Sequence, residues 1–523
     1  MKTYNVALNQ GIDYDAFWNE IETDGSGSTY VPNRSVSIVN ERPNSLRQCW
    51  YELSDAEAEK LRNDPRVYCV EIPPEHRTDI EITPTTTQTG LYYKGPNTGS
   101  NPNNNLGINW GLFRLNSRTN NTTSNSGTLN YDYNLDGTGV DVVIMDSGCQ
   151  VNHPDFNDAS GNSRVQQIDW YAANGYPPYP IGPLMPPYFY TDYDGHGTHC
   201  TGISAGTTYG RAKNSRIYIM TLSGLCEPPT NGISDTTAFD LIKGWHNNKP
   251  IDPLTGYKRP TVVNMSWAYT SSFANITGGN YRGTTWTGTT KQSQYGMIGN
   301  ASNRFGVRVD SIDVDVSELI AAGVVLVGAA GNFYQTIDVF DGTDYNNYFT
   351  SSIFGNIKYM QGASPSSSLD VICVGNVDSV AQSGTTEQKA SSSESGPRVD
   401  VWSPGTYIVS TTSNTNLYGA TTFYPTNSSF YIMTISGTSM ACPNIVGLCA
   451  QLLQLYPGYT PSQIRALVIA NSTSNVLYST GLSTDYSDSR SLHGGPNRFA
   501  YQAPTNTLNI TGAITMTNVS INI

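Results

Sequence analysis

The sequence is short of charged residues, of histidine and of long apolar runs. Only 14% of its 523 residues are charged, and six are histidines, none at a spacing typical of metal ligands. No stretch approaches the roughly 18 consecutive apolar residues of a membrane-spanning helix, so we expect no membrane span. The first residues, Met1 to Tyr4, lead into an alternating segment, and no apolar stretch of signal-peptide length is visible.

Positive charge is scarcer than negative charge. Lysine and arginine number 29 against 42 aspartates and glutamates, which gives a net charge of −13. This balance argues against a nucleic acid or an anionic membrane as the main partner. Glycine (49 residues) and tyrosine (34 residues) are abundant, so the chain is polar without being charged. Such a composition is typical of a loop-rich globular protein and not of a disordered one.

Cysteines are few for the length of the chain, and none forms a Cys-x-x-Cys pair. Eight cysteines in 523 residues are too sparse for a scaffold held together by disulfides. We therefore expect mostly buried free thiols, although one or two disulfide bridges stay open at this stage.

The length predicts two domains and a linker, because 523 residues exceed what one core normally organises. Residues 1–75 form the first predicted domain. Tyr4, Val6 and Leu8 alternate as in a half-buried strand, and Ser54 with Glu57 forms a capping box that opens a helix. The complete order is βαββαβ, that of a small α+β ferredoxin-like unit.

The remaining chain divides into a linker, a large domain and a tail. Residues 76–106 are rich in proline, threonine and asparagine and are predicted to be an extended linker. Residues 107–503 alternate helical patterns with short, continuous apolar runs, which are typical of parallel strands buried on both faces. We predict an α/β domain with a doubly wound, mostly parallel sheet, interrupted by a surface insertion at about 269–308. Residues 504–523 are predicted to be a carboxyl-terminal extension.

Three motifs combine side chains that acyl transfer requires. Asp146 ends a buried strand and precedes Ser-Gly, the position at which open α/β sheets place active sites. His196 lies between two glycines at the start of a helix of small residues. Ser439 opens a long apolar helix, so its N–H lacks an intrahelical acceptor. Taken alone, the aspartate and the serine could equally be helix caps or turn residues.

The histidine motif does not resemble a metal site. His196 and His199 are three residues apart, whereas the zinc-binding His-Glu-x-x-His pattern spaces its histidines by four and includes a glutamate. We therefore interpret His199 as a hydrogen-bonded helix residue and His196 as the chemically important one.

The order Asp, His, Ser along the chain is that of subtilisin. Six segments in this order resemble the subtilisin-like serine proteases, and particularly their proteinase K branch, over nearly the whole chain. They are Asp146–Gly148 with His153–Asp155, Asp194–Gly202, Asn264–Ser266, Ala329–Asn332, Ser403–Gly405 and Gly437–Ala441.

This resemblance implies roles for the matched residues. Ser439 is the expected nucleophile, His196 the general base and Asp146 the residue that orients the imidazole. The side chain of Asn332 and the N–H of Ser439 are the expected oxyanion hole. The implied substrate-binding residues form two segments. Ser266, Trp267 and Ala268 match the edge segment that pairs with extended substrate, and Ala329, Ala330 and Gly331 match the lining of the pocket for the residue before the cut.

The resemblance also implies that the amino-terminal unit is an inhibitory propeptide and that the linker contains the processing region. Where the family has Ser-Leu-Gly, this chain has Ser266–Ala268, so the substrate wall differs. No cofactor is expected for the chemistry. A structural calcium ion, as in proteinase K-like enzymes, would use the Asp400 carboxylate and the carbonyl groups of Asp370 and Ile372.

The leading hypothesis is therefore a serine endopeptidase made as a self-inhibited zymogen, with protein or peptide substrates and its own propeptide as partners. The alternative is a particle-associated (virion) structural or interaction protein with a plugged subtilisin-like domain, because no signal peptide is visible. Both hypotheses favour an extracellular or virion-associated location over a cytosolic one.

Overall fold

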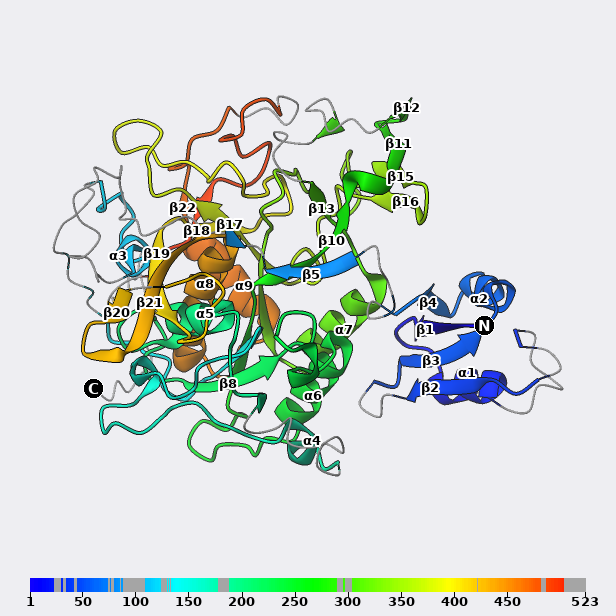
Figure 1. Cartoon of the computed structure of the whole chain (residues 1–523), viewed down its shortest axis with the longest axis horizontal. Helices are drawn as coiled ribbons and strands as arrows, with labels where there is room; N and C mark the ends of the chain where they lie inside the picture. Colours follow the sequence, from blue (N-terminus) through cyan, green and yellow to red (C-terminus); the bar gives the residue numbers. More distant parts are fainter. Residues whose placement is uncertain are drawn as a thin grey trace, which may run out of the picture.

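The computed structural model describes most of the chain, in which a small amino-terminal unit lies beside a much larger body (Figure 1). The residues described are 1–22, 30–31, 34–41, 45–73, 76, 80–84, 86–87, 109–123, 129, 131, 133–176, 188–288, 295–296, 303–420, 422–480 and 486–502. The predicted extension at 504–523 and most of the predicted linker lie outside these residues.

The amino-terminal unit has the predicted βαββαβ order. Its elements are β1 (Lys2–Leu8), α1 (Tyr14–Glu22), β2 (Ser37–Glu41), β3 (Gln48–Leu53), α2 (Asp55–Arg62) and β4 (Val67–Glu71). The strands form an antiparallel sheet in the order β2-β3-β1-β4. The alternation of Tyr4, Val6 and Leu8 places these three side chains in a core of the unit's own, and the capping box of Ser54 and Glu57 starts α2.

The body is built around an eight-stranded sheet in the order β22-β23-β18-β17-β14-β9-β7-β8. All neighbouring strands are parallel except β22 and β23. The prediction of a mostly parallel α/β sheet is confirmed, since the continuous apolar runs form its central strands. The strands are β7 (Asp141–Asp146), β8 (Arg216–Thr221), β9 (Thr261–Met265), β14 (Val325–Ala329), β17 (Ile372–Val377), β18 (Val401–Pro404), β22 (Thr473–Ser474) and β23 (Arg498–Phe499).

Helices cover this sheet and carry two of the predicted catalytic residues at their first turns. The helices are α3 (Trp110–Arg114), α4 (Trp170–Ala173), α5 (His196–Ala205), α6 (Asp235–Asn247), α7 (Asp310–Ala321), α8 (Thr438–Leu455) and α9 (Pro461–Asn471). Helix α8 contacts β9, β14, β17 and β18 and also packs against α5, so the starts of α5 and α8 lie close to the sheet.

Three smaller sheets surround the central one. The first joins β13 (Arg304–Gly306), β10 (Trp267–Ser272) and β5 (Ile80–Pro84). The second contains β11 (Ile276–Tyr281), β12 (Thr284–Thr287), β15 (Tyr348–Ser351) and β16 (Gly355–Lys358), and the third β19 (Ile408–Thr412), β20 (Thr422–Tyr424) and β21 (Asn427–Gly437). The segment predicted as a surface insertion therefore contributes strands to two of these sheets.

The segment predicted as an extended linker contains two short strands that pair with the body. Its strand β5 pairs with β10 of the body, and β6 (Thr86–Thr87) pairs with β21. Strands of this kind form through pairing with distant residues, so the local sequence does not reveal them.

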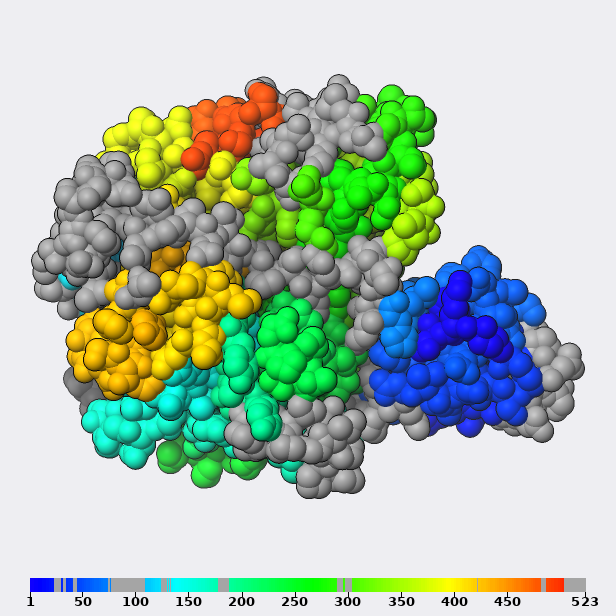
Figure 2. Space-filling view, in the orientation of Figure 1, coloured from blue at the N-terminus to red at the C-terminus, as the bar shows by residue number. Residues whose placement is uncertain are grey.

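The amino-terminal unit contacts the body through polar groups on α7. Gln48 Nε2 donates to Asp315 Oδ1 at 2.7 Å and to the carbonyl of Ser311 at 3.2 Å. The N–H of Ser311, in the first turn of α7, donates to Glu71 Oε1 at 2.6 Å. In the space-filling view the unit projects from one side of the body (Figure 2).

The cysteines agree with the expectation of free thiols. None of the eight takes part in a disulfide bond, and seven of them are buried while Cys69 is half-buried. Among the described residues, no helix is long and apolar enough to cross a membrane.

Candidate active site

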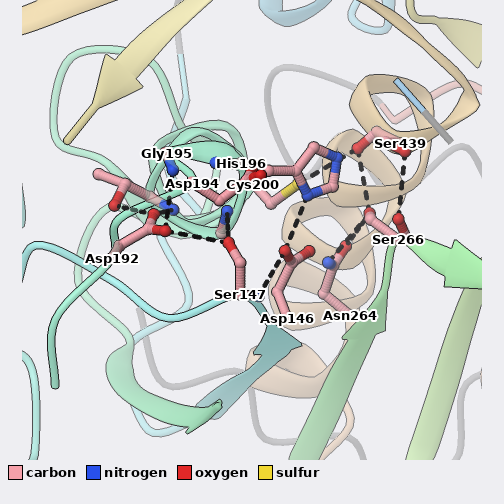
Figure 3. Close-up of polar contacts among 12 residues, drawn as sticks. Asp146, Ser147, Asp192, Asp194, Gly195, His196, Cys200, Asn264, Ser266 and Ser439 are labelled. Atoms are coloured by element: carbon pink, nitrogen blue, oxygen red, sulfur yellow. Dashed lines mark hydrogen bonds and ion pairs between the residues drawn. The ribbon is translucent and has the colours of Figure 1, made fainter. Parts of the chain in front are cut away.

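Asp146 and His196 form the centre of the site. Asp146 is the last residue of β7, and His196 is the first residue of α5. Their side chains are fully buried, with Asp146 Oδ1 2.7 Å from His196 Nδ1. Figure 3 shows the imidazole between the Asp146 carboxylate and the Ser439 side chain. His196 Nε2 is buried and has no hydrogen-bond partner among the described residues.

The carboxylate controls the protonation of the imidazole. Burial alone would lower the pKa of His196, but the charge of Asp146 and its hydrogen bond to the imidazole outweigh burial and hold the pKa well above the ordinary 6.5. Asp146 Oδ1 also accepts the N–H of Ser147 at 2.7 Å, which fixes its orientation. The arrangement favours a proton on Nδ1 and leaves Nε2 to exchange protons.

A small-residue contact brings α5 against the end of β7. A Cβ on Gly197 would lie 2.1 Å from the carbonyl oxygen of Gly148, so only glycine fits there. The N–H of Gly197 donates to Ser147 Oγ at 2.9 Å. The glycines around His196 therefore allow the helix to start close to the aspartate.

Asp192 organises the same helix start, and the sequence analysis missed it. Its Oδ2 accepts the N–H of Thr198 at 2.9 Å, and its Oδ1 accepts the N–H of Gly195 at 2.8 Å and Ser147 Oγ at 3.0 Å. Asp192 lies three residues before the N-cap Gly195, so the usual N-cap signal does not point to this role.

Ser439 is the second residue of α8, one of the first four whose N–H groups lack an intrahelical acceptor. Its Oγ donates to the carbonyl of Ser266 at 3.1 Å. Ser266 Oγ in turn donates to the carbonyl of Ser439 at 3.0 Å. This reciprocal pair attaches the start of α8 to the segment between β9 and β10.

Asn332 lies beside this helix start with its amide oriented. Its Oδ1 accepts the N–H of Thr438 at 3.0 Å and the Thr438 hydroxyl at 3.2 Å. Its Nδ2 is buried and has no partner among the described residues. A buried amide donor without an acceptor is uncommon and suits a group that binds a transient negative charge.

Two polar neighbours of His196 are chemically quiet. Cys200 Sγ lies 3.9 Å from His196 Nδ1, and burial raises the thiol pKa, so the thiol stays protonated. His199 is neutral because burial lowers its pKa to about 3, and its Nε2 bonds to the carbonyl of Met433 at 3.1 Å. The interpretation of His199 as a hydrogen-bonded helix residue agrees with this contact.

The two predicted substrate-binding segments both contact the start of α8, through Ser266 and through Gly331. Trp267 and Ala268 belong to β10, where they lie opposite Pro84 and Thr83 of β5. Ala329 ends β14, and Ala330 and Gly331 lead to Asn332.

The predicted calcium ligands do not fit a calcium ion. The carboxylate of Asp400 bonds to Arg398 at 3.0 Å and to Arg465 at 2.5 Å. Against the effect of burial, these two arginines keep the Asp400 pKa below its ordinary value. Arg398 also donates to the carbonyl of Val371 at 2.9 Å, next to Ile372, while Asp370 is exposed. Two guanidinium groups already balance the carboxylate, so we withdraw Asp370, Ile372 and Asp400 as a metal site.

A comparison with protein families identifies the architecture. Residues 137–496 match the Subtilase family. The chain belongs to the subtilase family. Subtilases of this kind are serine-type peptidases that act on proteins and need no cofactor for their chemistry, and this chain shares that class. The family match does not distinguish a proteinase K branch.

Curated relatives of this subtilase are proteases. The "Extracellular serine proteinase" of Thermus sp. (strain Rt41A) is 27% identical over 437 residues, which cover 84% of this chain and 73% of the relative. "Subtilisin-like protease 8" of Arthroderma otae is 28% identical over 401 residues, 74% of this chain, and the chain spans 61% of its length. Neither the family nor these relatives support the particle-associated alternative.

A solved structure agrees on the fold. Fervidolysin from Fervidobacterium pennivorans, described as a keratinolytic enzyme related to subtilisin, has a TM-score of 0.51 and 20% sequence identity. The match covers 95% of this subtilase and 60% of fervidolysin. At this identity the similarity concerns the fold alone.

Proposed function

We propose that this subtilase is a serine endopeptidase with Asp146, His196 and Ser439 as its catalytic triad. The observation that carries the proposal is the buried 2.7 Å contact of Asp146 with His196 Nδ1, with Nε2 unpartnered and the ring directed at Ser439 (Figure 3). His196 Nε2 takes the proton of Ser439 Oγ as that oxygen attacks the peptide carbonyl, and it then protonates the leaving amine. Asp146 stabilises the imidazolium formed in between.

The proposed oxyanion hole consists of Asn332 Nδ2 and the N–H of Ser439. The contacts of Asn332 Oδ1 with Thr438 orient the amide so that its donor is available at the start of α8. A rotation of the Ser439 side chain from the Ser266 carbonyl towards His196 completes the nucleophile, since hydrogen bonds of resting active sites commonly tighten when substrate binds.

The proposed substrate path follows the edge of β10. Extended peptides add to such an edge through main-chain hydrogen bonds. The antiparallel pairing of β5 with β10, from Ile80 opposite Ser271 to Pro84 opposite Trp267, supports this path because a segment of the chain itself adopts it.

We further propose that residues 1–75 inhibit the enzyme and that the linker occupies its cleft. On one side of Ser439, Pro84 lies opposite Trp267, and on the other side, Thr86 lies opposite Gly437. These two pairings lie at positions 84 and 86 of the linker. We propose that self-processing cuts one of the two peptide bonds within this interval, so that the released chain begins at residue 85 or 86.

The proposed location is extracellular. A relative named an extracellular serine proteinase supports it, as does a cleft that stays occupied by the chain's own linker until processing.

The test compares the wild-type chain with Ser439→Ala. Loss of the nucleophile lowers kcat by roughly 10⁶ in subtilisin, so casein hydrolysis by the variant falls to background. A fluorophosphonate probe labels only the wild type, and mass spectrometry finds a new amino terminus at residue 85 or 86 only there. Equal casein turnover by both proteins would remove the catalytic proposal. A processed wild type with a different amino terminus would remove the cleavage position alone.

A further inference from the structure

Glu394 carries a buried carboxylate that the proposed mechanism does not use. Its side chain is completely inaccessible to solvent, and neither carboxylate oxygen has a hydrogen-bond partner among the described residues. A buried carboxylate normally has an ion pair or several hydrogen bonds, because removing it from water is costly. Its isolation therefore requires an explanation.

The carboxylate lies directly behind one wall of the proposed substrate site. A Cβ on Gly331 would lie 2.4 Å from Glu394 Oε1, and the N–H of Glu394 donates to the carbonyl of Gly331 at 2.9 Å. Gly331 immediately precedes Asn332, and its own N–H donates to Thr438 Oγ1 at 3.2 Å. Glu394 thus contacts the residue that precedes Asn332 of the proposed oxyanion hole.

The same carboxylate oxygen also lies near the strand next to the substrate edge. A Cβ on Gly306 would lie 3.5 Å from the same Oε1 atom. Gly306 belongs to β13, which pairs with β10, and β10 in turn pairs with β5. The backbones of Gly331 and Gly306 therefore both lie against the same carboxylate oxygen.

The nearby lysine does not neutralise Glu394. Lys389 is buried, but its ammonium group donates to the carbonyls of Ala390, Ser391 and Ser393. Burial raises the pKa of Glu394 well above its ordinary value, and the charge of Lys389 offsets this only in part. A cationic group of another molecule could therefore bind the Glu394 carboxylate without displacing another partner.

We propose that Glu394 determines specificity by binding a lysine or arginine side chain of the substrate residue before the cut. This inference rests on the proposed function and names the substrate class of the same site. Residues 329–331 are two alanines and a glycine, so this wall carries no long side chain that would compete with a long substrate side chain. Its ammonium or guanidinium group then makes charge-assisted hydrogen bonds with Glu394, which are about twice as strong as neutral ones.

The linker explains why the carboxylate has no cation in this structure. The segment from Ile80 to Thr87 contains no lysine or arginine. Self-processing does not require one, because a covalently attached segment reaches the active site at a high effective concentration. Separate substrates lack this advantage and depend on the interaction with Glu394.

The experiment measures kcat/KM of the processed enzyme on peptides that differ only in the residue before the cut. Arginine is compared with citrulline, its uncharged analogue, and lysine with norleucine. We expect the charged member of each pair to react at least tenfold faster, since a site built for a polar group strongly rejects an analogue that leaves it unpaired. In Glu394→Gln this ratio falls to about 1, whereas Glu227→Gln, which removes one exposed charge, retains it.

A second measurement needs no variant. Benzamidine, a cation, inhibits the wild-type enzyme competitively at a concentration at least tenfold lower than the neutral benzamide. An enzyme labelled by fluorophosphonate at Ser439 but with equal rates on arginine and citrulline peptides would overturn the role of Glu394 and leave the proposed function intact. Absence of labelling would instead remove the proposed function, and this inference with it.

Discussion

The body and the amino-terminal unit bury their sheets in different ways. In the body, β7 is buried at all six positions, and apolar side chains fill both faces of the sheet. In the amino-terminal unit, one face of the sheet forms the small apolar core, whereas Asn5 and Gln48 are buried and polar. Asn5 Nδ2 donates to Gln48 Oε1 at 2.9 Å, and Gln48 donates onward to α7.

The two kinds of face have different roles: the apolar face stabilises the fold of the unit, and the polar face binds the unit to the body. An apolar face drives burial without a specific partner, whereas a buried polar face is stable only where each group finds its hydrogen bonds. Gln48 finds them on α7 of the body. We therefore expect changes in the body to alter catalysis, and changes in this face to alter inhibition without altering catalysis.

The largest effect belongs to the body. Asp146→Asn keeps the size of the side chain but removes its charge and favours the wrong tautomer of His196, so kcat falls by about 10⁴. The wild-type rate rises with pH as His196 loses its proton, at a pH above the ordinary 6.5. Without the carboxylate the pKa of His196 falls, so the midpoint of the kcat/KM profile moves to lower pH. An unchanged midpoint would contradict the assigned role of Asp146.

A smaller effect in the body comes from Asn332. Asn332→Asp retains the oxygen that accepts from Thr438 but loses the Nδ2 donor. Loss of the corresponding donor from subtilisin lowers kcat by about 10²–10³. We expect the same range here, with KM little changed. The matched control, Thr438→Val, keeps the N–H bond to Asn332 and should lose less than tenfold; an equal loss in both variants would point to a structural effect.

The polar face of the unit gives the third effect. Gln48→Ala removes the hydrogen bonds to Asp315 and Ser311, and a bond to a buried charge contributes about 1.5–3 kcal/mol. After self-cleavage, the Kd of the unit for the body should rise by roughly ten- to a hundredfold. Inhibition of peptide hydrolysis measures this Kd. Gln10→Ala, which changes an exposed residue, serves as the control. A lowered kcat of the freed body in Gln48→Ala would contradict the expectation that this face affects docking and not catalysis.

Local patterns predicted most of the elements and much of the site. Continuous apolar runs such as Val142 to Met145 indicate buried parallel strands, and these strands carry Asp146 to the sheet edge. The capping residues of α2 and α9 are equally local signals, and both capping boxes form.

Features that depend on distant partners could not be predicted in this way. The pairing of Pro84 with Trp267 joins segments far apart in the chain, and a Pro- and Thr-rich sequence suggests only a linker. The calcium prediction failed for the same reason, since Arg465 reaches Asp400 from α9. The isolation of Glu394 likewise becomes visible only once Gly306 and Gly331 are placed around it.

The smallest effect concerns the stability of the unit itself. Ser54→Ala removes the hydroxyl that accepts the N–H of Glu57 at 3.3 Å and bonds to Glu57 Oε2 at 2.9 Å. Loss of an N-terminal cap costs about 1 kcal/mol, whereas Ser54→Gly costs only a few tenths. Hydrogen exchange of the α2 amides in the full chain should therefore accelerate roughly fivefold in Ser54→Ala and much less in Ser54→Gly. Because α2 packs mainly on the strands of the unit, the Kd of the docked unit should change far less than in Gln48→Ala. A change in Kd as large as that of Gln48→Ala would mean that docking depends on the core of the unit and not on its polar face.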